Sequence, residues 1–360
     1  MTKSSIKLLK GVIIALGAFV VLAVIYFFAV YKFLFTASFT RKILDEKSYE
    51  KFFTLKQSDG SSEFHEDWFL RNKEDTEWFL AQTPELIHIN SFDGLKLVAY
   101  NLKNENALGT IILMHGYHSE PFREYACLAR YYYNLGYNVF LPYQRTHGNL
   151  DGVHSEGKYI TFGVKERYDL RDWILKVNEI YGENKPLFLQ GISMGCATTV
   201  MTLGFDLPSN IRGVIADCGF TTPYEIIWKV LTEDRKLPTA KLIIKIGNFL
   251  TNKIAGFDMN EYSTYEALTK NRSRENQIPI LFIHGNKDEY VPFEMSKKNF
   301  GTCLVSFTNI TDGAVAPIPN PQADKYSFYE VQNSPHAIEN FIDREQYEKR
   351  VADFLDRYLN

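Results

Sequence analysis

Residues 187–197 read Leu-Phe-Leu-Gln-Gly-Ile-Ser-Met-Gly-Cys-Ala, an apolar run that leads into a glycine-flanked serine and then into small residues. The apolar run predicts a buried strand, and the small residues predict the start of a helix. Between them, Gly191 to Gly195 fits the G-x-S-x-G nucleophile elbow, a tight turn in which a strained serine needs glycine on both sides. We therefore predict that Ser193 projects its hydroxyl above a sheet.

Short apolar runs recur on both sides of this stretch, and they define the rest of the sheet. The first two, residues 85–90 and 95–102, flank an Asp-Gly turn and predict an antiparallel hairpin. Later runs are separated mostly by segments of helical periodicity, and a final amphipathic helix is expected at about residues 344–359. This alternation predicts an α/β fold with a mostly parallel central sheet and helices on both faces. The later runs are Thr110–Met114, Asn138–Pro142, Pro186–Gln190, Ile211–Asp217 and Pro279–His284.

The bulk composition is that of a globular protein with one large core. Of 360 residues, 45% are hydrophobic, which is enough for an α/β domain and an appendage. The formal net charge is −3, whereas nucleic-acid-binding proteins usually carry an excess of basic residues. No nucleic-acid partner is therefore expected. The four cysteines are scattered without a C-x-x-C motif, and we predict buried thiols without disulfides. The spacing of the cysteines alone does not exclude one disulfide bond in a domain that is exported.

An uncharged, apolar segment extends from Gly11 to Tyr31. About 21 residues at about 1.5 Å each span a bilayer core of about 30 Å. The run is longer than the apolar part of a secretory signal, and aromatic residues stand where a small-residue cleavage site would be, so we predict an uncleaved signal anchor. Basic residues on the two sides are nearly balanced. The short basic N-terminus favours a cytoplasmic tail, with the globular domain outside the cell in a single-pass membrane protein.

The chain thus divides into three predicted parts. Residues 1–35 form the cytoplasmic tail and transmembrane anchor, 36–84 a linker of two helices, and 85–360 the α/β domain. Within that domain, residues 222–277 separate two core strands and contain helical patterns with exposed-looking hydrophobic residues, which predicts a lid insertion. Residues 308–322, with Gly313 and three prolines, predict an irregular loop.

The residues around Ser193 suggest a catalytic triad. A serine hydroxyl needs a histidine to accept its proton and a carboxylate to orient that histidine. Asp288 follows the last predicted core strand, and His336 precedes the final helix, which gives the chain order Ser, Asp, His. We predict Ser193 as nucleophile, Asp288 as acid and His336 as base. Asp217, just past its own strand, is the alternative acid.

The negative charge that develops during acyl transfer requires hydrogen-bond donors. The backbone N–H groups of Met194 and of Tyr117, which follows a core strand in His115-Gly116-Tyr117, are the predicted oxyanion hole. Several histidines lie in loops without the spacing of a metal site, and the mechanism needs no cofactor, so neither is expected. These histidines are His115, His118, His147 and His154.

Taken together, these motifs resemble the α/β-hydrolase superfamily of serine hydrolases. They comprise His115-Gly116-Tyr117, the elbow, His284-Gly285-x-x-Asp288 with Val291-Pro292, and His336. The segment 157–163, followed by Glu166, Asp169 and Trp173, is similar to a bacterial subgroup of membrane-tethered or cytosolic esterase-like members. The likeness covers about residues 85–360 and implies the same triad and oxyanion donors. One departure is Gln144, which stands where the subgroup commonly has aspartate.

These features predict a serine hydrolase that cleaves carboxylic esters or thioesters through an acyl-serine intermediate. A membrane tether and an apolar lid favour small-molecule esters of apolar or lipid-like character. The alternatives are a serine peptidase of the prolyl or aminopeptidase type, an acyltransferase of the cell envelope, and a non-catalytic binding protein on a degenerate hydrolase fold. The sequence identifies no protein partner.

Overall fold

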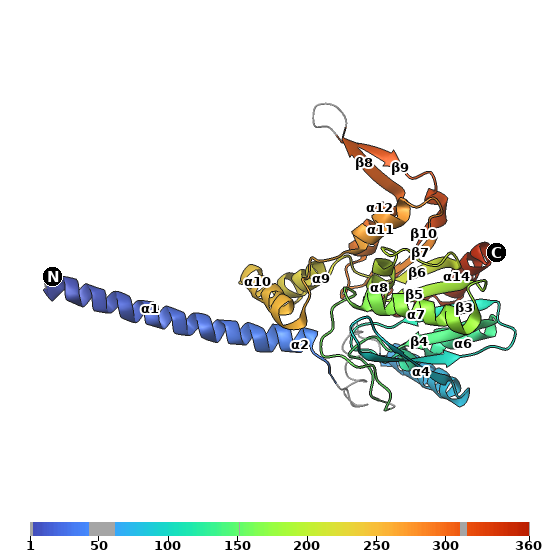
Figure 1. Cartoon of the computed structure of the whole chain (residues 1–360), viewed down its shortest axis with the longest axis horizontal. Coiled ribbons are helices and arrows are strands. Elements are labelled where there is room, and N and C mark those ends of the chain that lie inside the picture. The colour runs from blue at the N-terminus through green and yellow to red at the C-terminus, as the bar shows by residue number, and fades with distance from the viewer. Residues whose placement is uncertain (1–2, 43–61, 151, 310–314, 360) are drawn as a thin grey trace. The chain divides into compact units, whose positions relative to one another are not determined.

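The computed structural model describes residues 3–42, 62–150, 152–309 and 315–359 (Figure 1). The chain forms two compact units. The N-terminal unit comprises Met1–Thr40 and Ile227–Asp258, and the sheet unit comprises Arg41–Ile226 and Met259–Asn360. The residues predicted as a lid, 222–277, are thus shared between the two units.

The N-terminal unit is built on one long helix. Helix α1 (Lys3–Val30) continues through a π-helical turn η1 (Tyr31–Phe35) into α2 (Thr36–Phe39). The combined helix is long and apolar enough to cross a membrane, and none of its most apolar window is buried. The rest of the unit holds the end of α9 (Pro223–Lys229), η2 (Val230–Asp234), α10 (Ala240–Leu250) and η3 (Thr251–Ala255).

Helix α10 packs against the C-terminal end of this long helix (Figure 1). The Tyr26 hydroxyl donates a hydrogen bond of 2.7 Å to the Thr239 hydroxyl oxygen, just before α10 begins. Farther along, the rings of Phe39 and Phe257 lie with their centroids 6.0 Å apart. The unit is therefore held together by contacts between segments about 200 residues apart in sequence.

The sheet unit contains an eight-stranded sheet in the order β1-β2-β4-β3-β5-β6-β7-β10. The pairs β1–β2 and β2–β4 are antiparallel, and the remaining pairs are parallel. This arrangement confirms the predicted hairpin, the mostly parallel sheet and the fold class. The strands are β1 (Glu85–Asn90), β2 (Lys96–Leu102), β3 (Gly109–Met114), β4 (Tyr137–Pro142), β5 (Leu187–Ile192), β6 (Ile211–Asp217), β7 (Ile280–Gly285) and β10 (Tyr326–Val331).

Both faces of the sheet are covered, which explains why its inner strands are apolar throughout. One core includes Tyr132 of α6 (Ala126–Asn134) and Phe354 of α14 (Arg344–Tyr358), and the other includes Trp173 of α7 (Glu166–Tyr181) and Val200 of α8 (Met194–Thr202). Strands β3, β4, β5 and β7 are buried along their whole length. The helices of this unit are α4 (Ser62–Ala81), α5 (Pro121–Glu124), α6 (Ala126–Asn134), α7 (Glu166–Tyr181), α8 (Met194–Thr202), α11 (Thr264–Arg272), α12 (Phe293–Leu304), α13 (Glu339–Ile342), α14 (Arg344–Tyr358) and the short 3₁₀-helix η5 (Ala323–Lys325).

Two parts of the sheet unit differ from the prediction. The expected irregular loop at 308–322 is wrong where the chain is described, because β8 (Val305–Asn309) and β9 (Val315–Pro319) form an antiparallel hairpin. In an isolated two-stranded ribbon, the N–H groups that point away from the partner strand form no interstrand hydrogen bond. A proline at such a position therefore removes no hydrogen bond. Residues 310–314 lie outside the described part of the chain, as do residues 43–61 of the predicted helical linker.

Strand β10 is missing from the prediction. It pairs in parallel with β7 and forms one edge of the sheet. Its residues are a mixture of buried, half-buried and exposed positions, unlike the uniformly buried inner strands. This strand matters for the site, because the chain that leaves it carries His336.

Candidate active site

Ser193 occupies the sharp turn between β5 and α8. Its backbone has φ 56° and ψ −117°, a conformation unfavourable for residues with a side chain. A Cβ atom on Gly191 would lie 2.2 Å from the carbonyl oxygen of Gly195, and one on Gly195 would lie 1.8 Å from that of Met114. The Ser193 N–H donates a 3.0 Å bond to the Asp217 carbonyl. Both glycines are therefore required by the close approach of backbone to backbone.

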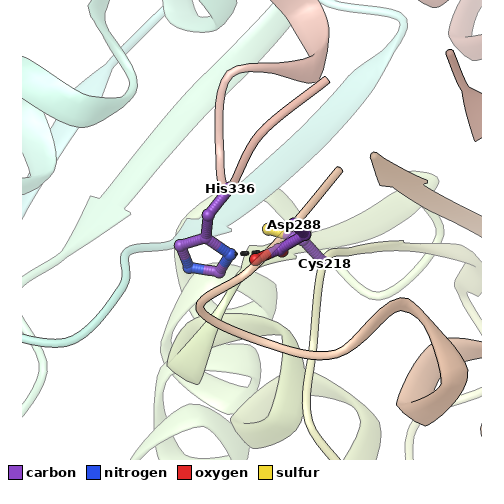
Figure 2. A group of neighbouring side chains, drawn as sticks. All are labelled: Cys218, Asp288 and His336. Carbon is purple, nitrogen blue, oxygen red and sulfur yellow. Dashed lines mark hydrogen bonds and ion pairs between the residues drawn. The ribbon is translucent and has the colours of Figure 1, made fainter. Parts of the chain in front are cut away.

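Three side chains from separate loops meet at this turn. The Ser193 hydroxyl lies 2.8 Å from Nε2 of His336. On the other side of the ring, Nδ1 of His336 lies 2.6 Å from Oδ2 of Asp288, a contact drawn in Figure 2. All three residues are buried. They follow β5, β7 and β10, whose carboxyl ends share one edge of the parallel sheet, where ligands bind in open α/β sheets. The structure thus brings together the three residues predicted as nucleophile, acid and base.

The carboxylate of Asp288 accepts four hydrogen bonds. Oδ2 faces Nδ1 of His336 and, at 3.0 Å, Nε2 of His284, whereas Oδ1 accepts the backbone N–H groups of Tyr290 at 2.9 Å and Val291 at 2.8 Å. Burial raises the pKa of Asp288, but the two histidines outweigh it and hold that pKa well below its usual range. Asp288 is therefore ionised and holds the ring proton of His336 on Nδ1, so that the unprotonated Nε2 faces the Ser193 hydroxyl.

His284 is a second histidine on the same carboxylate, for which the sequence motif predicts no role of its own. Its Nδ1 lies 2.6 Å from the Ser296 hydroxyl, and its Nε2 also lies 3.0 Å from the Val291 carbonyl. Burial lowers the pKa of His284, but the bond to Asp288 raises it above the usual value overall. In the sequence, the only indication of this contact is that His284 precedes Asp288 by four residues.

A buried cluster lies behind the triad. Figure 2 shows Cys218 beside Asp288 and His336, and the potential ligand atoms of these three lie within 4.8 Å of one another. The same holds for Asp217, Cys218 and Glu339. Burial raises the pKa of Cys218 well above its usual value, so the thiol is protonated in this structure. With both ring nitrogens of His336 already bonded, the geometry fits proton transfer better than metal ligation.

Asp217, the alternative acid, has different partners. Its Oδ2 accepts a 2.7 Å bond from the Tyr347 hydroxyl, and burial raises its pKa well above the usual value. Neighbouring Glu339 accepts the Gly285 N–H at 3.0 Å, and burial raises its pKa to about 7. The hydrogen bond of the His336 ring goes to Asp288 and not to Asp217.

The predicted oxyanion loop passes close to the elbow. A Cβ atom on Gly116 would lie 3.4 Å from Cβ of Ser193, so the loop that carries Tyr117 runs beside Ser193. The Gly116 N–H donates a 2.6 Å bond to Glu124, which holds this loop in place. Met194 is the first residue of α8, and backbone N–H groups at a helix start point away from the helix.

Gln144, the departure from the subgroup, links three elements near the site. Its side-chain N–H group donates to the His115 carbonyl, and its side-chain oxygen accepts a 3.0 Å bond from the Thr198 hydroxyl of α8. Its backbone N–H also donates to Nε2 of His115 at 3.0 Å. An ionised aspartate has no donor and could not make the bond to the carbonyl. Glutamine therefore has a structural reason to stand here.

The other residues of the subgroup-like segment also support the framework. Asp169 of α7 accepts two bonds of 2.7 Å from Arg145, and Glu166 accepts the Gly163 N–H at 2.9 Å. The ring of Trp173 is fully buried in the core. These residues hold the loops after β4 against α7.

The sequence is similar to one protein family and to two individual proteins. Residues 158–360, more than half of the chain, match the prolyl oligopeptidase family. The Bacillus subtilis protein YqkD, described as uncharacterized, is 24% identical over 268 residues, which are 74% of this chain and 78% of that protein. The uncharacterized membrane protein YNL320W of Saccharomyces cerevisiae is 25% identical over 233 residues, covering 65% of this chain and 72% of its own.

The fold has relatives among solved structures. The Pyrococcus furiosus esterase Pf2001 superposes with a TM-score of 0.57 at 22% identity, over 78% of this chain and 94% of the esterase. At that identity the likeness concerns the fold. The family match and the fold lead to one conclusion: the chain belongs to the prolyl oligopeptidase family and is a serine hydrolase of the α/β-hydrolase fold.

Proposed function

We propose that this protein hydrolyses carboxylic esters or thioesters through an acyl intermediate on Ser193. The observation that carries the proposal is the hydrogen-bonded chain from the Ser193 hydroxyl through His336 to Asp288, with distances of 2.8 Å and 2.6 Å. The neighbouring loop of Tyr117 and the start of α8 at Met194 supply the N–H groups that such chemistry needs.

The reaction proceeds in two halves. His336 accepts the Ser193 proton as the serine oxygen attacks the acyl carbonyl, and the N–H groups of Tyr117 and Met194 donate to the resulting oxyanion. When the bond to the alcohol or thiol breaks, His336 protonates that leaving group and the acyl chain remains on Ser193. Water then attacks with His336 as base, which releases the carboxylic acid and restores the serine hydroxyl. Asp288 stabilises the imidazolium in both halves.

A second candidate is a serine peptidase, which the family match favours. The same triad would cleave an amide, with His336 protonating the leaving amine. The long apolar helix α1 favours the ester reading with apolar or lipid-like substrates, because a membrane-held enzyme meets amphiphiles at the lipid surface.

Turnover of two substrate series separates these candidates. Purified full-length protein would be assayed with p-nitrophenyl esters of increasing chain length and with aminoacyl-prolyl p-nitroanilides, alongside Ser193→Ala. We expect ester turnover with an optimum at a medium or long chain, little anilide turnover, and loss of both in the variant. Anilide turnover with the higher kcat/KM would replace the esterase proposal with the peptidase one.

We also propose that α1 anchors the chain in a membrane as a single pass, with the sheet unit outside the cell. The proposal rests on the uncharged run from Gly11 to Tyr31 and the basic residues before it. Leu175 of α7 is 51% exposed, so Leu175→Cys would present a thiol on the sheet unit. We expect a membrane-impermeant maleimide to label this variant in intact cells. Labelling that requires cell lysis would reverse the orientation.

A further inference from the structure

Helix α10 presents an apolar face that the described residues of the N-terminal unit leave exposed. Its other face is buried through Ile243, Ile244 and Leu250. On the open face, Leu242 is 50% exposed and Phe249 52%, and their spacing of seven residues puts them on one side of the helix. In the following turn η3, Ile254 is a further apolar side chain that is 41% exposed. We call the pair Leu242 and Phe249 the apolar face of α10.

The charged side chains of α10 and η3 themselves have one sign. Between Ala240 and Ala255 the sequence contains three lysines, Lys241, Lys245 and Lys253, and no acidic residue. All three lysines are exposed. Lysines beside apolar side chains on one helix are typical of helices that lie in a membrane interface, where the stems follow the apolar surface and the ammonium groups reach the headgroups.

The position of α10 along α1 matches the same environment. Thr239, just before α10, accepts its hydrogen bond from Tyr26, which lies within the uncharged run that ends at Tyr31. Five residues at about 1.5 Å each put Tyr26 about 7.5 Å from the end of the run. Interfacial helices lie about 5–10 Å deep, at the boundary between headgroups and acyl chains. The contact therefore holds the start of α10 near the depth at which such a helix lies.

We propose that the apolar face of α10 lies in the surface of the membrane that α1 crosses, with the three lysines on anionic lipid headgroups. The occupant of the exposed face is thus a lipid bilayer. The inference rests on the proposed membrane anchor, but it does not depend on the proposed hydrolase activity. It gives the N-terminal unit two attachments to lipid, one through the bilayer and one along its surface.

Site-specific fluorescence in the full-length protein tests this directly. Single cysteines at three positions would be labelled with the environment-sensitive fluorophore NBD: Phe249→Cys on the apolar face, Val20→Cys in α1, and Leu175→Cys on α7. The background would carry Cys127→Ser, since Cys127 is the half-buried one of the four native cysteines. Leu175 is a matched control because it is also a large hydrophobic residue on a helix and is exposed to nearly the same extent as Phe249. The protein would be placed in nanodiscs containing phosphatidylglycerol and a lipid with a nitroxide on its acyl chain.

We expect blue-shifted, nitroxide-quenched emission at positions 20 and 249, and unshifted, unquenched emission at position 175. The triple variant K241Q/K245Q/K253Q should lose quenching at 249 while keeping it at 20. If position 249 behaves like position 175 while position 20 is quenched, the anchor stands and the surface proposal is overturned. If position 20 is not quenched, the anchor itself fails and the surface proposal fails with it. Activity of the same samples reports separately on the hydrolase.

Discussion

Asp288 and Asp217 are buried carboxyls at the carboxyl ends of neighbouring strands, yet their surroundings move their pKa values in opposite directions. Burial raises both pKa values, but two histidines and two backbone N–H groups overcome it at Asp288 and lower its pKa. Asp217 has the Tyr347 hydroxyl and an acidic neighbour in Glu339, so its pKa stays raised. At the scale of single residues, partners rather than residue type decide which carboxyl is ionised.

Substitution of the two carboxyls distinguishes their roles. Asp288→Asn should lower kcat by about 10⁴-fold, because an amide cannot hold the proton of His336 on Nδ1 or stabilise the imidazolium. Asp217→Asn should lower kcat by a much smaller factor, since its oxygen can still accept from Tyr347. Steady-state kinetics on the best ester, with thermal unfolding as a folding check, measures both. Equal losses in two well-folded variants would contradict the assignment of Asp288 as the acid.

Glu339 makes stability depend on pH. Burial raises its pKa to about 7 in the folded protein, above the ordinary 4.5, so the folded state holds this proton more tightly than the unfolded state. Its contribution is therefore fully present below about pH 4.5 and is lost as pH rises to about 7. Glu339→Gln stays neutral and keeps an oxygen for the Gly285 N–H. We expect the Tm of this variant, relative to wild type, to rise between pH 5 and pH 7.5.

The matched control is Glu345→Gln, which changes an exposed glutamate on α14. Its Tm difference from wild type should stay constant over the same pH range. A Tm difference for Glu339→Gln that is also constant, or that falls with pH, would show that Glu339 is ionised in the folded protein throughout.

At the scale of elements, the elbow depends on contact between β3 and α8. A Cβ on Gly195 would overlap the Met114 carbonyl, and backbone cannot move aside as a flexible side chain can. Gly195→Ala should therefore lower the free energy of unfolding by about 1–3 kcal/mol or more, measured by urea denaturation. Gly301→Ala in α12 is the control, since its Cβ would meet nothing within 4 Å and alanine favours helix by about 1 kcal/mol. A Gly195→Ala protein as stable as wild type would contradict the packing of the elbow.

Arg145, in the loop after β4, forms ion pairs with α7 and with the β1–β2 turn. It lies 2.7 Å from Asp169 of α7 and 2.9 Å from Asp93 in the β1–β2 turn, and the Asp169 side chain is only 2% exposed. Burial already raises the pKa of Asp169 to about 7, so without Arg145 this carboxyl would take up a proton. We expect Arg145→Ala to lower the free energy of unfolding by about 1–3 kcal/mol, because the buried Asp169 loses its hydrogen-bond partner. The exposed pair Lys349–Asp353 serves as a control, and Lys349→Ala should change stability little. Comparable small effects in both variants, measured by urea denaturation, would refute the bracing role of Arg145.

At the scale of the whole molecule, the sheet was predictable where its strands are buried on both faces. Such strands stand out as short apolar runs between turn residues, and their bounds follow the structure closely from β3 to β7. The edge strand β10 and the hairpin β8–β9 were missed because half-exposed strands mix polar and apolar residues. Their positions depend on pairing with distant segments, which local patterns do not encode.

The candidate site also contains residues that the sequence predicts and residues that it does not. Ser193, Asp288 and His336 could be proposed from motif and chain order, and the structure joins them through hydrogen bonds. The closeness of Cys218 and Glu339 could not be proposed, because it depends on which strands are neighbours in the sheet. The association of residues 227–258 with the N-terminal helix could not be predicted either, because no motif in one segment indicates that it packs against the other.

The rate and position of fluorophosphonate labelling test the proposed catalytic triad most directly. The full-length protein would be reacted with a fluorescent fluorophosphonate, the adduct mapped by peptide mass spectrometry, and the rate compared with those of Ser193→Ala and His336→Ala. We predict one adduct on Ser193, none in Ser193→Ala, and a rate at least about 10²-fold lower in His336→Ala because the general base is lost. An adduct on another residue, or an unchanged rate without His336, would contradict the catalytic triad.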